Sequence, residues 1–211
     1  MAKKRMLITA GPTREMLDPI RYLSNHSTGE MGYALARVAH AKGYRVTLVS
    51  GPTALTPPRG VRFVPVVSAK SMEKECRRYF FKSDILIMSA AVCDFTPVSI
   101  RCQKIRRQGP LRLVLKKTSD ILAGLARKKG ERCVIGFCLE TQNWIRNAKL
   151  KLRKKKLDGI VANYCSRGYV PFGDRPIRVA IIDKAERVRL MPSQTKDRLA
   201  HKLLSWVERM R

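Results

Sequence analysis

The sequence has few acidic and few aromatic residues. Sixteen Asp and Glu stand against 44 Lys and Arg, which leaves a net charge of +28. Such a positive field suits nucleic acid, an acidic lipid surface or an anionic small substrate drawn into a cleft. Because aromatic residues make up only 7% of the chain, there is little surface on which bases could stack. The basic residues are also spread along the chain, so specific nucleic-acid binding is disfavoured.

Long hydrophobic runs and paired cysteines are missing too. No apolar stretch approaches the length needed to cross a bilayer, and the N-terminal segment Met1–Met6 has too short an apolar part for a signal peptide. We therefore expect a cytoplasmic protein that is not bound to membranes. The six cysteines form no C-x-x-C pair, which argues against zinc and a disulfide framework and favours reduced thiols.

The chain is long enough to bury a real core. Its 211 residues are 45% hydrophobic and contain no internal repeat, so we expect one domain over residues 1–211. Strand and helix patterns alternate, which predicts an α/β fold with a doubly wound, mostly parallel, Rossmann-like sheet. The predicted strands are Met6–Ala10, Val46–Ser50, Arg62–Pro65, Ile85–Ala90, Val134–Phe137 and Gly159–Ala162. The predicted helices are Gly32–Lys42, Ser68–Phe80, Ser119–Lys128 and Gln142–Lys156.

Two regions interrupt this alternation. Residues 93–118 form a polar, basic insertion after a strand, where lids are common, and we expect a flexible flap over about residues 95–112. Near the C-terminus, Arg178–Asp183 and Arg187–Met191 flank a short turn and predict a β-hairpin extension. A closing helix should follow from Ser193, whose side chain can cap it.

The polar loop Asn25–Gly32 lies between the first strand and an apolar helix. Open α/β sheets bind ligands in such loops, because the exposed N–H groups and the dipole of the helix favour anions. Only Gly29 and Gly32 are available, so the G-x-G-x-x-G dinucleotide fingerprint fails. The loop therefore predicts a phosphorylated ligand other than a conventionally bound dinucleotide.

Other polar segments follow strands at the same predicted sheet edge. In Ser89–Phe95, small residues let a ligand approach the backbone, and Asp94 either binds a base, sugar or cation or caps the next turn. Ser119 or Asp120 can cap a helix, and Phe137 either stacks on a base or belongs to the core. The basic cluster Lys104–Arg107 lies in the flap, and Lys151 and Lys155 share one helical face.

This ordered series of motifs resembles the phosphopantothenoylcysteine synthetase family of coenzyme A biosynthesis. The matching segments cover nearly the whole chain: Ile8–Glu15, Asp18–Gly32, Ala90–Asp94, Lys104–Arg107, Gly136–Thr141 and Lys156–Asn163. The resemblance implies a ligase that couples 4′-phosphopantothenate to L-cysteine. The carboxylate would attack the α-phosphate of a nucleoside triphosphate, CTP more often than ATP, and the cysteine amine would then attack the acyl-nucleotide.

The resemblance also implies the cofactors and the partners. Mg²⁺ (or Mn²⁺) would screen the phosphates, although the sequence identifies no metal ligands, and members form homodimers. Many bacterial relatives carry this domain behind a flavin-dependent decarboxylase; this chain has none, so a stand-alone enzyme without flavin is expected.

Site roles carry over by position. Asn25 and Lys104 would be catalytic, Asn25 at the acyl-nucleotide carbonyl and Lys104 during acyl-nucleotide formation. The nucleotide site would comprise Ser89, Ala90, Asp94, Lys104, Ser119, Asp120, Ile121, Leu122, Phe137, Lys151 and Lys155. The other substrates would meet Asn25, Ser27, Gly29, Ala90 and Ala91.

Four positions depart from the family pattern. Glu30 stands where Lys is common, Thr28 replaces a frequent Ser, and Arg106-Arg107 replace two lysines. Two alternatives to the ligase are therefore weighed: a basic nucleic-acid-binding α/β module, motivated by the net charge, and an inactive homologue, motivated by Glu30.

Overall fold

The structure, a computed structural model, describes residues 3–107 and 109–210. The strands are β1 (Arg5–Ala10), β2 (Arg14–Met16), β3 (Tyr22–Ser24), β4 (Arg45–Ser50), β5 (Arg62–Pro65), β6 (Ile85–Met88), β7 (Phe95–Pro97), β8 (Leu115–Lys117), β9 (Cys133–Glu140), β10 (Gly159–Tyr164), β11 (Ile177–Asp183) and β12 (Val188–Gln194). The helices are α1 (Glu30–Ala41), α2 (Ala69–Phe80), α3 (Ile121–Ala126), α4 (Trp144–Lys155) and α5 (Lys196–Arg209).

The central sheet has the strand order β12-β11-β10-β9-β6-β1-β4-β5. The strands from β10 to β5 are parallel, and β11 and β12 run antiparallel at one edge. The chain winds outward from β1 through β4 to β5 and then returns to β6 on the other side of β1. The winding therefore reverses between β1 and β6, and the predicted doubly wound, mostly parallel sheet with a C-terminal hairpin is confirmed.

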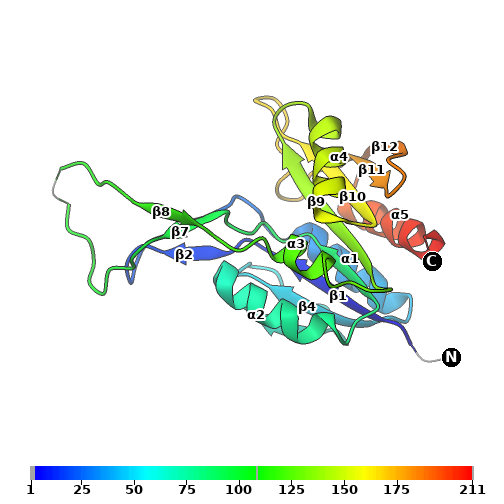
Figure 1. The fold of residues 1–211 in the computed structure, drawn as a ribbon, viewed down its shortest axis with the longest axis horizontal. Coiled ribbons are helices and arrows are strands. Elements are labelled where there is room, and N and C mark those ends of the chain that lie inside the picture. The colour runs from blue at the N-terminus through cyan, green and yellow to red at the C-terminus, as the bar shows by residue number, and fades with distance from the viewer. Residues whose placement is uncertain (1–2, 108, 211) are drawn as a thin grey trace.

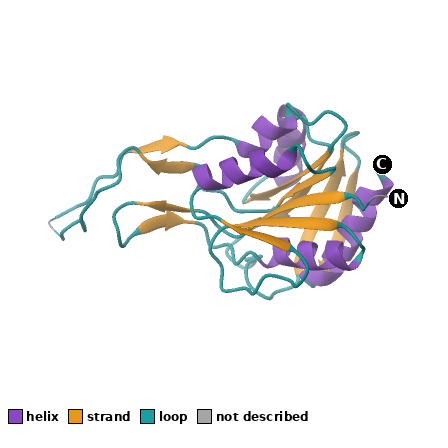
Figure 2. Ribbon diagram, turned by 90° about the horizontal axis from the view of Figure 1, so that it is seen from below, coloured by secondary structure: helices purple, strands orange, loops and turns teal. Residues whose placement is uncertain are grey.

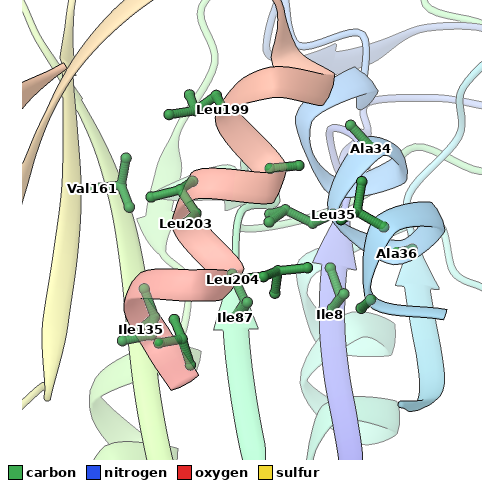
Figure 3. Close-up of a cluster of buried hydrophobic side chains, with 14 of the residues drawn as sticks. Ile8, Ala34, Leu35, Ala36, Ile87, Ile135, Val161, Leu199, Leu203 and Leu204 are labelled. Carbon is green, nitrogen blue, oxygen red and sulfur yellow. The ribbon is translucent and has the colours of Figure 1, made fainter. Parts of the chain in front are cut away.

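Each face of the sheet is covered by helices. Ile8 points to the side of α1 and α5, and its neighbour Leu7 points to the side of α2, α3 and α4. Figure 3 shows Leu203 and Leu204 of α5 and Leu35 of α1 above the strands. Because both faces are buried, the central strands are apolar at nearly every position. Each fully buried Leu or Ile contributes about 1.5–3 kcal/mol relative to an exposed one.

Two glycines set the close packing of the first helix. Gly29 precedes α1 with φ 84°, in the left-handed region that favours glycine. A Cβ on Gly32 would lie 2.4 Å from the Cβ of Ala10. The start of α1 therefore lies directly against the end of β1.

Several predicted boundaries differ from those of the structure, among them two next to the site. The strand predicted to reach Ala90 ends at Met88, because the following small residues leave the sheet and turn toward the site. The closing helix does not begin at Ser193, because β12 continues to Gln194. Thr195 is the N-cap instead, and its side chain accepts a hydrogen bond from the backbone N–H of Arg198.

An arm projects from the end of the sheet that carries the carboxyl ends of the parallel strands. It consists of two antiparallel pairs, β2–β3 and β7–β8, with the predicted flap at its tip. Figure 1 shows β2, β7 and β8 side by side, and Figure 2 shows both pairs extending away from the helices. The sequence predicted no strand between Ala10 and Val46 and a polar, basic insertion over residues 93–118, so these short strands were missed.

Candidate functional site

A cavity of about 630 Å³ opens at the carboxyl ends of the strands. It lies at the point where the winding reverses between β1 and β6, the usual ligand position in open α/β sheets. Residues 27–32 line one side and 88–92 the next. The remaining walls come from residues 94–95, 117–122, 137–139 and 171–172, with Lys151, Lys155, Asn163, Ile177, Val179 and Lys196.

The start of α1 forms an anion-receptive wall of this cavity. Gly29 is the N-cap of the helix and provides no side chain, so the first-turn N–H groups have no side-chain cap. Ser27 accepts a hydrogen bond from the N–H of Gly29 at 3.3 Å, which shapes the loop. Free N–H groups and the helix dipole favour a negatively charged group at this point.

The wall opposite is built by the start of α3. Asp120 is the N-cap: its carboxylate accepts a hydrogen bond from the N–H of Ala123 at 3.0 Å and lies 3.0 Å from the ammonium of Lys155. Burial opposes ionisation of Asp120, but these two bonds outweigh it and lower the pKa of the carboxyl. Asp120 therefore holds the side chain of Lys155 at the cavity.

Lys151 is held in the same manner from α4. Its Nζ lies 2.5 Å from the Oε1 of Glu140, at the end of β9. Desolvation works against the ammonium, but the hydrogen bond and the charge of Glu140 prevail and raise the pKa of Lys151. Both lysines predicted for the nucleotide site thus reach the cavity charged, each beside a carboxylate.

All the predicted site residues except two line this cavity. Those that do are Ser27, Gly29, Ser89, Ala90, Ala91, Asp94, Ser119, Asp120, Ile121, Leu122, Phe137, Lys151 and Lys155. The ring of Phe137 also packs against the core on the α1 and α5 side, so both interpretations of this residue apply.

Asn25 lies at the rim of the cavity, outside its lining. Its side-chain N–H donates to the carbonyl of Ala91 at 2.9 Å, and the same nitrogen lies 3.7 Å from the sulfur of Cys93. These contacts fix the amide beside the strand end that carries the predicted substrate residues. Asn25 is thus adjacent to the cavity and is already oriented.

Lys104 lies on the arm, away from the cavity lining. Its side chain is exposed and makes no hydrogen bond or ion pair within residues 3–107 and 109–210. The next residue is anchored: the N–H of Ile105 donates to Asp18 at 3.1 Å, and Arg21 donates to the Ile105 carbonyl at 2.6 Å. The structure thus separates Lys104 from the other predicted residues.

Asp18 is the buried centre of that anchor, and the sequence reasoning gave it no role. Its side chain is fully buried, and one oxygen accepts hydrogen bonds from the N–H groups of Ile20 and Arg21, both at 2.8 Å. Burial alone would raise the pKa of Asp18, but the bond from Ile105 and these two lower it below the ordinary value. The ionised carboxylate thus joins the β2–β3 hairpin to the flap.

Sequence reasoning also missed the wall formed by Pro171, Phe172 and Lys196. The ring of Phe172 lies 6.0 Å from that of His26, so this segment meets the loop before α1. The one local signal was Lys196 beside the N-cap position of the last helix, where a cation opposes the helix dipole.

The residues of the cavity suit a divalent cation that enters bound to the phosphates of a small molecule. Within the described residues there is no group of three or more His, Cys, Asp or Glu that could hold a metal ion. Mg²⁺ is commonly bound by one or two carboxylates together with substrate phosphates and water. Among the carboxylates of the cavity, Asp94 is exposed and has no polar side-chain partner in the described chain, which leaves it free for such a role.

Fold and cavity together define an open, doubly wound α/β protein whose site suits an anionic ligand. The chain belongs to the family described as the DNA/pantothenate metabolism flavoprotein C-terminal domain, whose profile matches residues 1–210. This membership confirms the resemblance inferred from the motifs.

Two curated relatives are bifunctional proteins of coenzyme A biosynthesis. The coenzyme A biosynthesis bifunctional protein CoaBC of Bacillus subtilis is 45% identical over 195 residues, which are 92% of this chain and 48% of that protein. The CoaBC protein of Borreliella burgdorferi is 40% identical over 208 residues, which are 97% of this chain and 52% of that protein. The chain thus spans about half the length of these relatives.

Two solved structures have the same fold. The crystal structure of the C-terminal domain of a CoaBC protein is 39% identical, with a TM-score of 0.85 over 98% of this chain and 95% of that one. A Cab2 variant in complex with phosphopantothenate-cysteine is 16% identical, with a TM-score of 0.80 over 98% of this chain and 87% of that one. At this identity the second comparison establishes the fold alone. Within residues 3–107 and 109–210, no helix is long and apolar enough to span a membrane.

Proposed function

We propose that this chain is a phosphopantothenate–cysteine ligase of coenzyme A biosynthesis. The observation that carries the proposal is the convergence on one switch-point cavity of the residues that the family pattern assigns to the nucleotide and to phosphopantothenate. Family membership over residues 1–210 supports the same activity. The retained Asn25 and Lys104 argue against an inactive homologue.

The first step activates a carboxylate. The carboxylate of 4′-phosphopantothenate attacks the α-phosphorus of a nucleoside triphosphate, CTP in preference to ATP, and the bond to pyrophosphate breaks. Lys151 and Lys155 lie on one face of α4 and bind the triphosphate, with Mg²⁺ screening its charge when bound. Lys104 must move in from the arm to stabilise the negative charge that develops on the phosphate oxygens.

The second step forms the amide. The amine of cysteine attacks the carbonyl carbon of the acyl-nucleotide, loses a proton and expels the nucleoside monophosphate. Asn25 is oriented by the Ala91 carbonyl, and its second amide N–H stabilises the carbonyl oxygen as this oxygen gains negative charge. The phosphate of phosphopantothenate binds near the uncapped start of α1.

Exposed apolar side chains on the arm support the proposal that the protein is a homodimer. Apolar side chains are exposed along the arm, among them Tyr22, Phe95, Val98 and Leu113. A second copy that packs against these side chains would remove them from water, which favours association. Sedimentation velocity measures this state, and a monomer at micromolar concentration would contradict it.

The ligase is tested with purified protein, 4′-phosphopantothenate, cysteine and Mg²⁺, comparing CTP with ATP. Pyrophosphate release that requires phosphopantothenate, followed by release of nucleoside monophosphate that requires cysteine, is the expected result. A reaction without cysteine should stop at the acyl-nucleotide, which mass spectrometry identifies. No pyrophosphate with either nucleotide would refute the ligase, and a higher kcat/KM with ATP would refute the preference for CTP.

A further inference from the structure

Lys196 is an almost buried lysine that joins three segments of the chain at the cavity. It is the first residue of α5, and only 10% of its side chain is exposed. Its ammonium donates hydrogen bonds to the backbone carbonyls of Gly173 and of Arg175, the latter at 3.2 Å. It also lies 3.1 Å from the Oε2 of Glu30, the first residue of α1. The two carbonyls take two of the three N–H donors of an ammonium, and Glu30 lies close enough for an ion pair.

The Glu30 carboxylate depends on this lysine. Its Oε2 is buried and makes no directed hydrogen bond within the described residues, so its contact with Lys196 is one of charge. A buried charge without a partner is costly. Glu30 also lines the cavity beside the uncapped start of α1, where an anionic group is expected to bind. Without Lys196, its negative charge would repel that group.

The two carbonyls belong to the segment of residues 170–176, which we call the wall segment. Its members Pro171 and Phe172 line the cavity. Within the described residues, the hydrogen bonds of the wall segment are those that its carbonyls accept from Lys196. Lys196 is therefore the polar anchor that holds this wall of the cavity in place.

We propose that Lys196 is a positioning residue that clamps the wall segment against the start of α1 and cancels the charge of Glu30 in the cavity. The second role rests on the proposed ligase function, because it concerns the binding of an anionic substrate. The two roles are separable: the carbonyl bonds hold the wall, and the charge of the ammonium makes Glu30 compatible with an anion. The departure of Glu30 from the family pattern is thus compensated within this chain.

Hydrogen exchange tests the clamp without reference to any substrate. In Lys196→Met, the N–H of Arg178, which donates to the Tyr169 hydroxyl at 2.8 Å across the base of the wall segment, should exchange about tenfold faster than in the wild type, because local opening of the segment becomes easier. Lys202→Met, on the exposed side of the same helix, is the matched control and should exchange like the wild type. Unchanged exchange in Lys196→Met would overturn the clamp.

Steady-state kinetics with 4′-phosphopantothenate tests the charge role. Lys196→Met should raise KM at least about tenfold, while kcat changes less than about threefold, since binding rather than chemistry is affected. Adding Glu30→Gln to that variant should recover most of the KM, because the uncompensated charge is gone. A double variant as impaired as Lys196→Met would overturn the charge role and leave the clamp alone. Wild-type protein without ligase activity would refute the proposed function and with it the charge role, whereas hydrogen exchange would still decide the clamp.

Discussion

The end of the sheet and the projecting arm hold their functional residues in opposite ways. At the sheet, buried strand ends and ion pairs fix the residues proposed to bind the nucleotide in place before any ligand binds, as Lys155 beside Asp120 illustrates. On the arm, Lys104 is exposed and without a polar partner in the described chain, and the buried Asp18 anchors its neighbour. Binding is preorganised, whereas the residue expected to act in the first chemical step has to be delivered.

Lys104→Gln should have the largest effect on activity. Loss of the cation that stabilises the transition state should lower acyl-nucleotide formation at least about 10³-fold. Since the side chain is exposed and makes no contact with the core, the midpoint of thermal unfolding should not change. Single-turnover measurement of pyrophosphate gives the rate. Lys116→Gln, also exposed on the arm, serves as the control and should keep full activity; an equal loss there would assign the effect to the charge of the arm as a whole.

Asn25→Asp should block the second step and spare the first. The substitution replaces the donor to Ala91 with a carboxylate oxygen, so the oxygen of the acyl-nucleotide meets repulsion instead of a hydrogen bond. Amide formation should fall about 10²-fold or more, and acyl-nucleotide should accumulate. Quenched reactions separated by chromatography report both species, and normal turnover would exclude the role.

Leu35→Ala should lower the stability of the folded protein, because Leu35 lies in the core beside the central sheet. Leu35 is 0% exposed between α1 and the strands, and its truncation leaves a cavity, so the free energy of unfolding should fall by about 2–5 kcal/mol. Urea denaturation measures this quantity. Leu150→Ala, on an α4 position that is 49% exposed, is the matched control and should change it by less than about 0.5 kcal/mol. Equal effects at the two positions would contradict the assignment of the core.

Asp18→Asn should loosen the arm with the smallest effect on activity. The amide cannot replace both acceptor oxygens, so the Ile105 amide should exchange faster and kcat/KM should fall about tenfold, through poorer delivery of Lys104. Asp174→Asn, at an exposed position whose side chain makes no hydrogen bond or ion pair in the described chain, should behave like the wild type. Unchanged exchange at Ile105 would refute the anchor.

The same anchor predicts a pH dependence. The folded-state pKa of Asp18 lies below its ordinary value, so its contribution to stability is complete above the ordinary aspartate pKa of about 3.9. It is lost as the pH falls through the folded-state pKa. Exchange at Ile105, corrected for the intrinsic pH effect, should therefore be constant between about pH 5 and 7 and should rise in stronger acid. In Asp18→Asn this acid-dependent rise should be absent.

The sequence predicted the parts of the fold that local patterns determine. The strand Arg62–Pro65 has its predicted bounds, and Ser68 caps α2 where the sequence predicted the start of a helix. The carboxyl ends of parallel strands meet at one edge, so the convergence of the cavity residues could be predicted as well. The three-residue strands of the arm could not, because they are too short to show an alternating pattern.

The remaining wall of the site depends on contacts between distant parts of the chain. Phe172 lies in no local pattern that indicates a cavity, and the only local signal at Lys196 is the unfavourable place of a cation at a helix N-terminus. Each residue reaches the cavity through contacts with elements far away in sequence. The predicted cap Ser193 failed for a related reason: pairing of β12 with β11 extends the strand past it, and this tertiary pairing outweighs the local capping preference.

The pairing of the first helix with the last also bears on how the protein is made. Leu35 of α1 lies in the same core as Leu199 and Leu203 of α5, and Glu30 of α1 forms an ion pair with Lys196 of α5. A chain that emerges from the ribosome N-terminus first presents α1 and one face of the sheet long before α5 exists to cover them. Until α5 is synthesised, the nascent chain exposes the apolar surface that α5 covers in the folded protein, and this is the kind of surface that chaperones recognise.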